Sequence, residues 1–174
     1  MKKTLLILSF MVLFSCKKEP EPFYEFDTVD YYHVDINQDE RMALFDRQNN
    51  PERDDKIFWD LFFKNTTTKA LKDKEFIANL KRLYKIQGTI NKKYYGAINN
   101  IFSEKFNSSD YTIACEPEYR DILIFKKDNK VTGIAKICFE CEKSNLIGTN
   151  KKTAYLGNEN DFSRLKGILN EQEK

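Results

Sequence analysis

The stretch of residues 115–141 constrains the fold of this chain more than any other part of the sequence. Two apolar runs, residues 122–125 and 131–139, lie on either side of the pair Asp128 and Asn129. Strand-like apolar runs joined by two turn-forming residues are typical of a β-hairpin. The same stretch contains every cysteine of the chain but one. A single hairpin is therefore predicted to carry both a large part of the core and the candidate chemistry.

Counting outward from the two turn residues predicts the strand register, in which Phe125 faces Thr132. Continued to the end of the hairpin, this register places Cys115 one residue from the position opposite Cys141. A disulfide needs Cα atoms about 4.4–6.8 Å apart. The expected geometry therefore allows Cys115 to pair with Cys141 or, across a bulge, with Cys138, and it leaves this choice open.

Cys138 and Cys141 have the CxxC spacing of thiol-redox and zinc-binding proteins. Residues three apart on a regular strand point to opposite faces, which argues against a bond between these two cysteines. A thioredoxin-like pair also needs its first thiol at a helix N-terminus. Here the pair follows a predicted strand, and Glu140 and Glu142 disfavour a thiolate. Thiol-redox chemistry at this pair is thus an alternative, not the favoured interpretation.

A zinc site is the second alternative, because Cys115, Cys138, Cys141 and the only histidine, His33, would make a Cys₃His ligand set. However, the chain has one CxxC pair where zinc-binding modules usually have two metal-binding pairs, and an exported compartment favours oxidation over coordination by thiolates. A lone histidine on a strand is also usually neither a ligand nor a catalyst. We favour a structural disulfide from Cys115, with one buried thiol and no metal or other cofactor.

Residues 1–15 have the pattern of a secretory signal peptide. Lys2 and Lys3 form a basic start, and residues 5–14 form an apolar run too short to span a bilayer. Residues 13–16 then read Leu-Phe-Ser-Cys. This combination resembles the lipobox of bacterial lipoproteins. The resemblance implies cleavage before Cys16, which would carry a thioether-linked diacylglycerol and an amide-linked acyl chain such as palmitate.

Residues 16–22 continue as Cys-Lys-Lys-Glu-Pro-Glu-Pro, a composition that favours an extended tether. By analogy with enteric lipoproteins, Lys17 in place of an aspartate after the cysteine implies sorting to the outer membrane. The expected location is therefore the cell envelope, with the lipid bilayer contacted through Cys16. The sequence leaves the leaflet open.

Overall charge argues against a nucleic-acid partner. The chain has 29 basic and 27 acidic side chains, and removing Lys2 and Lys3 with the signal peptide leaves 27 of each. The basic residues are scattered among acidic ones, which gives no electrostatic footprint for DNA or RNA. An apolar content of 41% indicates a globular structure instead of a disordered one. Residues 23–174 are long enough for one domain with one core.

The periodicity of the remaining chain predicts an α+β fold. Helical spacing of apolar residues indicates helices at residues 37–50, 54–64, 73–86, 91–106 and 161–170. Strand patterns indicate residues 31–36, 111–114 and 145–149 beside the hairpin. We expect an antiparallel sheet of about four strands with helices packed mainly on one face.

The pattern Cys-x-Pro-x-x-Arg-Asp-Ile-Leu-Ile-Phe from Cys115, followed by Ile-Cys-Phe-x-Cys ending at Cys141, resembles a group of bacterial lipoproteins that have no assigned activity. The resemblance covers about residues 70–170 and implies that the three cysteines form one unit. No catalytic set stands out in the sequence. We therefore expect a lipid-anchored cell-envelope protein with a non-catalytic binding or structural role. The alternative is an envelope thiol-redox or metal-binding protein that uses the cysteine cluster.

Overall fold

The structure is a computed structural model, which describes residues 20–105, 114–153, 156 and 160–172. The predicted signal peptide and the predicted lipidation residue Cys16 lie outside the described residues. So does most of the strand predicted at residues 111–114.

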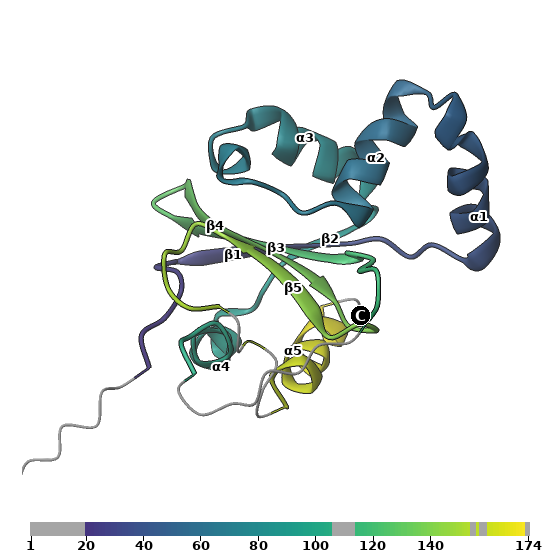
Figure 1. The fold of residues 1–174 in the computed structure, drawn as a ribbon. Coiled ribbons are helices and arrows are strands. Elements are labelled where there is room, and N and C mark those ends of the chain that lie inside the picture. Colours follow the sequence, from purple (N-terminus) through teal and green to yellow (C-terminus); the bar gives the residue numbers. More distant parts are fainter. Residues whose placement is uncertain (1–19, 106–113, 154–155, 157–159, 173–174) are drawn as a thin grey trace, which may run out of the picture.

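The described chain is built on a five-stranded antiparallel sheet with the strand order β2-β1-β3-β4-β5 (Figure 1). The strands are β1 (Thr28–His33), β2 (Ile86–Thr89), β3 (Asp121–Lys127), β4 (Lys130–Cys138) and β5 (Lys143–Ile147). The hairpin predicted from the sequence forms β3 and β4. Strand β3 is the central strand of the sheet, and β4 lies between β3 and the edge strand β5. The α+β class is confirmed, with one strand more than the number expected.

Helices cover both faces of this sheet. The helices are α1 (Gln38–Asp46), α2 (Arg53–Phe63), α3 (Lys74–Leu83), α4 (Tyr95–Ile101) and α5 (Asp161–Asn170), with short 3₁₀ turns η1 (Arg47–Asn49), η2 (Thr68–Leu71) and η3 (Lys92–Tyr94). Figure 1 shows α1, α2 and α3 above the sheet and α4 and α5 below it. The expectation that the helices pack mainly on one face is therefore wrong.

The reason lies in strands β3 and β4, whose apolar side chains are buried on both faces of the sheet. Ile122 and Ile124 of β3 belong to the core under α1–α3, whereas Leu123 and Phe125 belong to the core over α4 and α5. All four side chains are fully buried. Because successive strand residues point to opposite faces, a continuous apolar run needs cover on both faces. One layer of helices would have left half of this run in water.

The hairpin turn forms as predicted, but the pairing of the two strands beyond Lys126 differs from the predicted register. Asp128 and Asn129 have φ angles of 49° and 61°, the left-handed values that a tight two-residue hairpin turn requires. A β-bulge between Phe125 and Lys126 then shifts the pairing, so that Phe125 faces Gly133 where Thr132 was expected. A bulge adds one unpaired residue to one strand, which displaces every later pair by one position.

Strand β2 is the element that the sequence did not predict. The expected helix over residues 73–86 ends at Leu83, and Gly88 lies within an edge strand opposite Tyr31 of β1. Tyr84 caps the helix and is completely buried, and its hydroxyl donates to the carbonyl oxygen of Tyr119 at 2.7 Å. Burying this ring turns the chain toward the sheet, which is why the helix stops early.

The first described residues contact the segment that directly follows α4. Pro22 forms an isolated antiparallel bridge with Ser103, and the amide of Phe23 donates to the carbonyl oxygen of Phe102 at 2.7 Å. We call this contact the entry strap. Figure 1 shows the entering chain and α1 at opposite ends of the view. Within the described ranges, no helix is long and apolar enough to cross a membrane.

Two glycines provide a matched test of the packing. A methyl group on Gly133 would overlap the ring of Tyr24, which is buried and donates its hydroxyl to the carbonyl oxygen of Ile134 at 3.2 Å. We expect Gly133→Ala to lower the free energy of unfolding by about 1–3 kcal/mol. A methyl on Gly167 of α5 meets no atom within 4 Å, so Gly167→Ala should raise stability by about 0.5–1 kcal/mol. Urea unfolding measures both, and equal midpoints for the two variants would contradict this packing.

Candidate functional site

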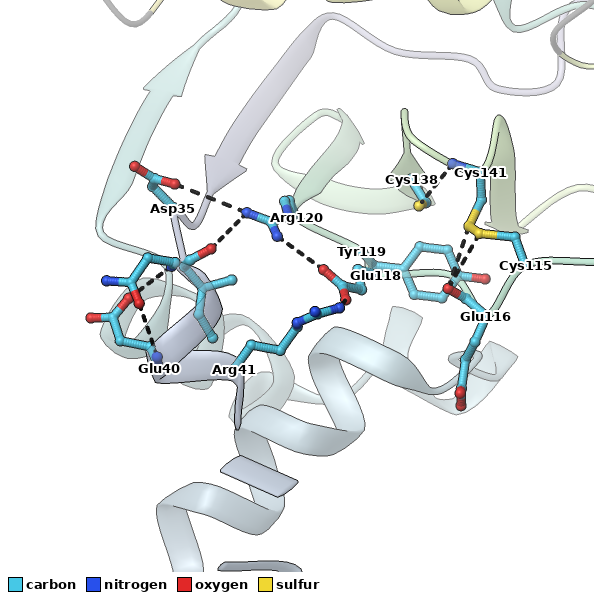
Figure 2. A network of polar contacts seen from close by, with 12 residues as sticks. Asp35, Glu40, Arg41, Cys115, Glu116, Glu118, Tyr119, Arg120, Cys138 and Cys141 are labelled. Atoms are coloured by element: carbon cyan, nitrogen blue, oxygen red, sulfur yellow. Dashed lines mark hydrogen bonds and ion pairs between the residues drawn. A yellow bond between two sulfur atoms is a disulfide. The ribbon is translucent and has the colours of Figure 1, made fainter. Parts of the chain in front are cut away.

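The cysteine cluster is the candidate site, and three separate segments build it. Cys115 lies in the segment before β3, and Cys141 lies in the turn between β4 and β5. These two residues form a disulfide with their Cα atoms 5.8 Å apart (Figure 2). Of the two pairings that the sequence left open, the structure has Cys115–Cys141. Cys138, at the end of β4, keeps a free and buried thiol.

The CxxC pair lies at a turn and not along a strand. Strand β4 ends at Cys138, and Glu142 has a φ angle of 47°, which belongs to the reversal into β5. The backbone amide of Cys141 donates to the sulfur of Cys138 at 3.4 Å (Figure 2). The expectation that these two cysteines point to opposite faces of a strand is therefore wrong. The turn brings the free thiol next to a residue of the disulfide.

Tyr119 packs against the cysteine cluster. Its ring packs with Cys138 and Cys141, all three at most 3% exposed, and Cys115 lies against them. The hydroxyl of Tyr119 donates to Oδ1 of Asn65 at 2.6 Å. Burial, with a smaller contribution from the nearby Cys138, raises the pKa of Tyr119 to about 12. The phenol thus remains protonated at neutral pH and acts as a hydrogen-bond donor.

Lys136 is a fully buried cation beside this cluster. Its Nζ donates to the carbonyl oxygen of Lys64 and lies 4.5 Å from the centroid of the Tyr119 ring. Lys64 is the C-terminal cap of α2, so the amine sits where the helix dipole and the ring both favour a positive charge. Burial nevertheless lowers the pKa of Lys136 to about 7, and Asp60 opposes this only in part.

A buried carboxylate ties helix α1 to the segment that carries Cys115. Glu118 accepts from Nη1 of Arg41 at 2.8 Å and from Nη2 of Arg120 at 2.9 Å (Figure 2). Arg120 also donates to the carbonyl oxygen of Ile36 at 2.9 Å. A buried charge is stable only when it is paired and hydrogen-bonded. Two guanidinium groups on one carboxylate therefore hold the chain three residues after Cys115.

His33 lies elsewhere. Its Nδ1 is 2.9 Å from Oδ1 of Asp121, which also accepts from the hydroxyl of Tyr31 at 2.6 Å. His33 shares a sheet face with Tyr31, in the core over α4 and α5, whereas Cys138 shares a face with Ile134, in the core under α1–α3. In the part of the chain that the structure describes, no three histidine, cysteine or acidic side chains are grouped so that they could hold a metal ion. The proposed Cys₃His set is not assembled.

Three buried charged residues were not predicted from the sequence: Lys136 and Glu118 beside the cysteine cluster, and Asp121 beside His33. Lys136 had a readable signal, because it interrupts the apolar run from Ile134 to Ile137 in a strand that is buried on both faces. A charge in such a run must find a buried partner. Glu118 and Asp121 had no comparable signal, since acidic residues are common along the whole chain.

No family model, no curated protein and no solved structure matches this chain. A disulfide between distant segments acts as a rigid cross-link, and a buried thiol beside it adds the means for thiol–disulfide exchange.

Removal of the disulfide tests its structural role. The bond closes a separation of 26 residues, so the double variant Cys115→Ala with Cys141→Ala should lose about 3 kcal/mol of unfolding free energy. The matched control is Cys138→Ala, which removes one buried sulfur and no cross-link and should cost about 0.5–1.5 kcal/mol. Urea unfolding without reductant measures both. Equal losses would contradict the cross-link as the main stabilising contribution.

The pH dependence of stability tests Lys136. Burial lowers its pKa from 10.5 to about 7, so between these values the unfolded chain binds a proton that the folded chain does not. The free energy of unfolding that Lys136 contributes therefore rises with pH across this window. At and below pH 7, burial of the protonated amine lowers the free energy of unfolding most. Lys136→Met removes this titration and should be more stable than the wild type by about 1–4 kcal/mol at low pH.

Urea midpoints of the two proteins, compared below pH 7 and at two pH values between 7 and 10.5, should show a difference that shrinks as the pH rises. A difference that stays constant over the whole range would contradict the buried, titrating amine.

Proposed function

We propose that this chain is a lipid-anchored protein of the cell envelope, sorted to the outer membrane, whose folded part has a non-catalytic binding or structural role. The observation that carries the proposal is the start of the sequence: a basic pair, a short apolar run and Leu-Phe-Ser-Cys at residues 13–16. The lipid on Cys16 is the anchor.

The Cys115–Cys141 disulfide supports an exported location. Disulfides persist in oxidising compartments and are rare in the reducing cytosol. The bond joins two segments that the sheet alone does not hold together, since Cys115 lies before β3 and Cys141 lies beyond β4. A cross-link of this kind stabilises a domain that works outside the cytosol.

The entry strap supports the anchoring geometry. Five residues lie between Cys16 and the strap residue Pro22, and an extended chain spans at most about 3.6 Å per residue. The folded part would therefore stay within roughly 20 Å of the bilayer surface. Because the chain enters at the end of the molecule opposite α1 (Figure 1), α1 and α2 would lie on the side away from the anchor.

A groove beside α1 supports a binding role. Its volume is about 320 Å³, and charged residues share its lining with the apolar side chains of Val34, Ile36, Leu44, Phe58 and Leu83. Concave sites with an apolar floor and polar edges are typical of ligand binding. On the same helix, the large apolar side chains of Met42 and Phe45 are 49% and 38% exposed. We infer that α1 and its groove form the surface available to a partner.

The thiol-redox alternative is supported by one observation, the free Cys138 thiol against the bonded Cys141. It concerns the chemistry of the domain and not its anchoring, so the two proposals are compatible.

Metabolic labelling with an alkyne analogue of palmitate, followed by membrane fractionation, tests the anchor. The wild-type chain should incorporate the label and float with the outer membrane, because Cys16 is the acceptor of the lipid. Cys16→Ala should lose the label completely, whereas the matched control Lys17→Ala should keep it. An unlabelled wild-type chain, or a label that persists in Cys16→Ala, would refute the proposal.

A further inference from the structure

The three cysteines of the cluster differ in their access to solvent. Cys138 is 2% exposed and Cys141 is 3% exposed, whereas Cys115 is only partly buried and is flanked by the exposed Ala114 and Glu116. The resting structure thus keeps its free thiol inside and its most accessible sulfur blocked in a disulfide. An exchange of partners would reverse this arrangement.

The geometry of the turn places the free thiol next to the bond. The amide nitrogen of Cys141 lies 3.4 Å from the sulfur of Cys138, so the free thiol contacts the residue that carries one sulfur of the disulfide. Figure 2 shows Cys138 and the disulfide at the same end of the hairpin, with this hydrogen bond between them. Exchange requires the Cys138 side chain to turn from this amide toward the sulfur of Cys141.

We propose that Cys138 exchanges with the Cys115–Cys141 disulfide, and that Cys115 is thereby a latent surface thiol, a modification site for low-molecular-weight disulfides and other thiol-specific reagents of the envelope. The inference rests on the geometry of the cysteine cluster and not on the predicted lipidation of Cys16. It goes beyond the anchoring role, and either proposal can fail without the other.

The exchange balances without any external reactant. The Cys138 thiol loses its proton, and its thiolate attacks the sulfur of Cys141. The Cys138–Cys141 bond forms as the Cys115–Cys141 bond breaks, and the sulfur of Cys115 leaves as a thiolate that takes up a proton. One thiol and one disulfide are present before and after, so nothing is oxidised or reduced overall.

Nearby donors and cations oppose the unfavourable charges of Glu140 and Glu142 at the attacking sulfur. The Cys141 amide already donates to the sulfur of Cys138, and this hydrogen bond strengthens when the sulfur becomes negative. Lys136 lies two residues before Cys138 on the same face of β4. Lys143 faces Cys138 across the β4–β5 ladder, and its Nζ donates to the carbonyl oxygen of Cys115.

The released segment would be short. Glu118, held by two arginines, fixes the chain three residues after Cys115. Exchange therefore frees the Cys115 side chain and its immediate neighbours and leaves β3 in place. The product exposes one thiol without unfolding the sheet.

The test uses the full chain purified in detergent without reductant. The protein is incubated with N-ethylmaleimide over a time course and then mapped by mass spectrometry without reduction, with Cys16 scored separately. We expect the maleimide on Cys115, in molecules that carry a Cys138–Cys141 bond. Labelling of Cys138 with the Cys115–Cys141 bond intact, or no labelling before denaturation, would overturn the proposal.

The matched variant Cys138→Ala keeps the disulfide and lacks the attacking thiol. Its Cys115 should be labelled at least about tenfold more slowly than in the wild type, because intramolecular exchange is its route of release. Equal rates would refute the mechanism. In a second variant, Cys115→Ala, glutathione disulfide should drive formation of a Cys138–Cys141 bond. Failure to form this bond would show that the two sulfurs cannot meet.

Discussion

The structure depends on burying both faces of the β3–β4 pair. Apolar side chains of these two strands are buried on both faces over Ile122–Phe125 and Ile134–Ile137, where Lys136 is the one charged residue. Each face must be covered, so the chain places three helices on one side and two on the other (Figure 1). The neighbouring strands β1 and β5 complete the hydrogen bonding along the two sides of the pair. Most other features follow from this arrangement.

The polar exceptions within the pair are resolved in different ways on the two faces. On the side of α2, Lys136 reaches the C-terminal carbonyl oxygen of the helix and lies over an aromatic ring. On the opposite side, Asp121 accepts hydrogen bonds from Tyr31 and lies beside His33. Lys136 is thus hydrogen-bonded to the end of helix α2, and Asp121 to residues of the neighbouring strand β1. Such directional contacts fix the position of an element more sharply than apolar packing, which is non-directional.

The sequence predicted correctly those elements whose structure depends on residues close together in the chain. The helix predicted at residues 161–170 is α5, and the helix predicted from residue 73 begins with Asp73 as its cap, where its side chain accepts from the amide of Glu75. The Asp128–Asn129 turn also formed as predicted. Each of these features depends on spacing and side-chain chemistry within one or two turns of chain.

Features that depend on distant partners were not predicted. Strand β2 exists because β1 provides an edge for it, and no residue near Gly88 indicates that edge. The bulge at Phe125 moved the register by one position, although the turn itself was placed correctly. The cover on both faces could have been deduced, because an unbroken apolar run is incompatible with one wet face. The partner of Cys115 is Cys141, in the turn after β4, and the strand pattern left this choice open.

The entry strap has a mechanical consequence for any chain held at its N-terminus. A pull on the tether first meets the contacts of Pro22 with Ser103 and of Phe23 with Phe102. Behind them comes β1, which is hydrogen-bonded on both sides, to β2 and to β3. A force along an interior strand loads its hydrogen bonds in shear, many at a time, whereas an edge strand can be peeled away one bond at a time. The attachment point thus directs tension into the most resistant direction of the sheet.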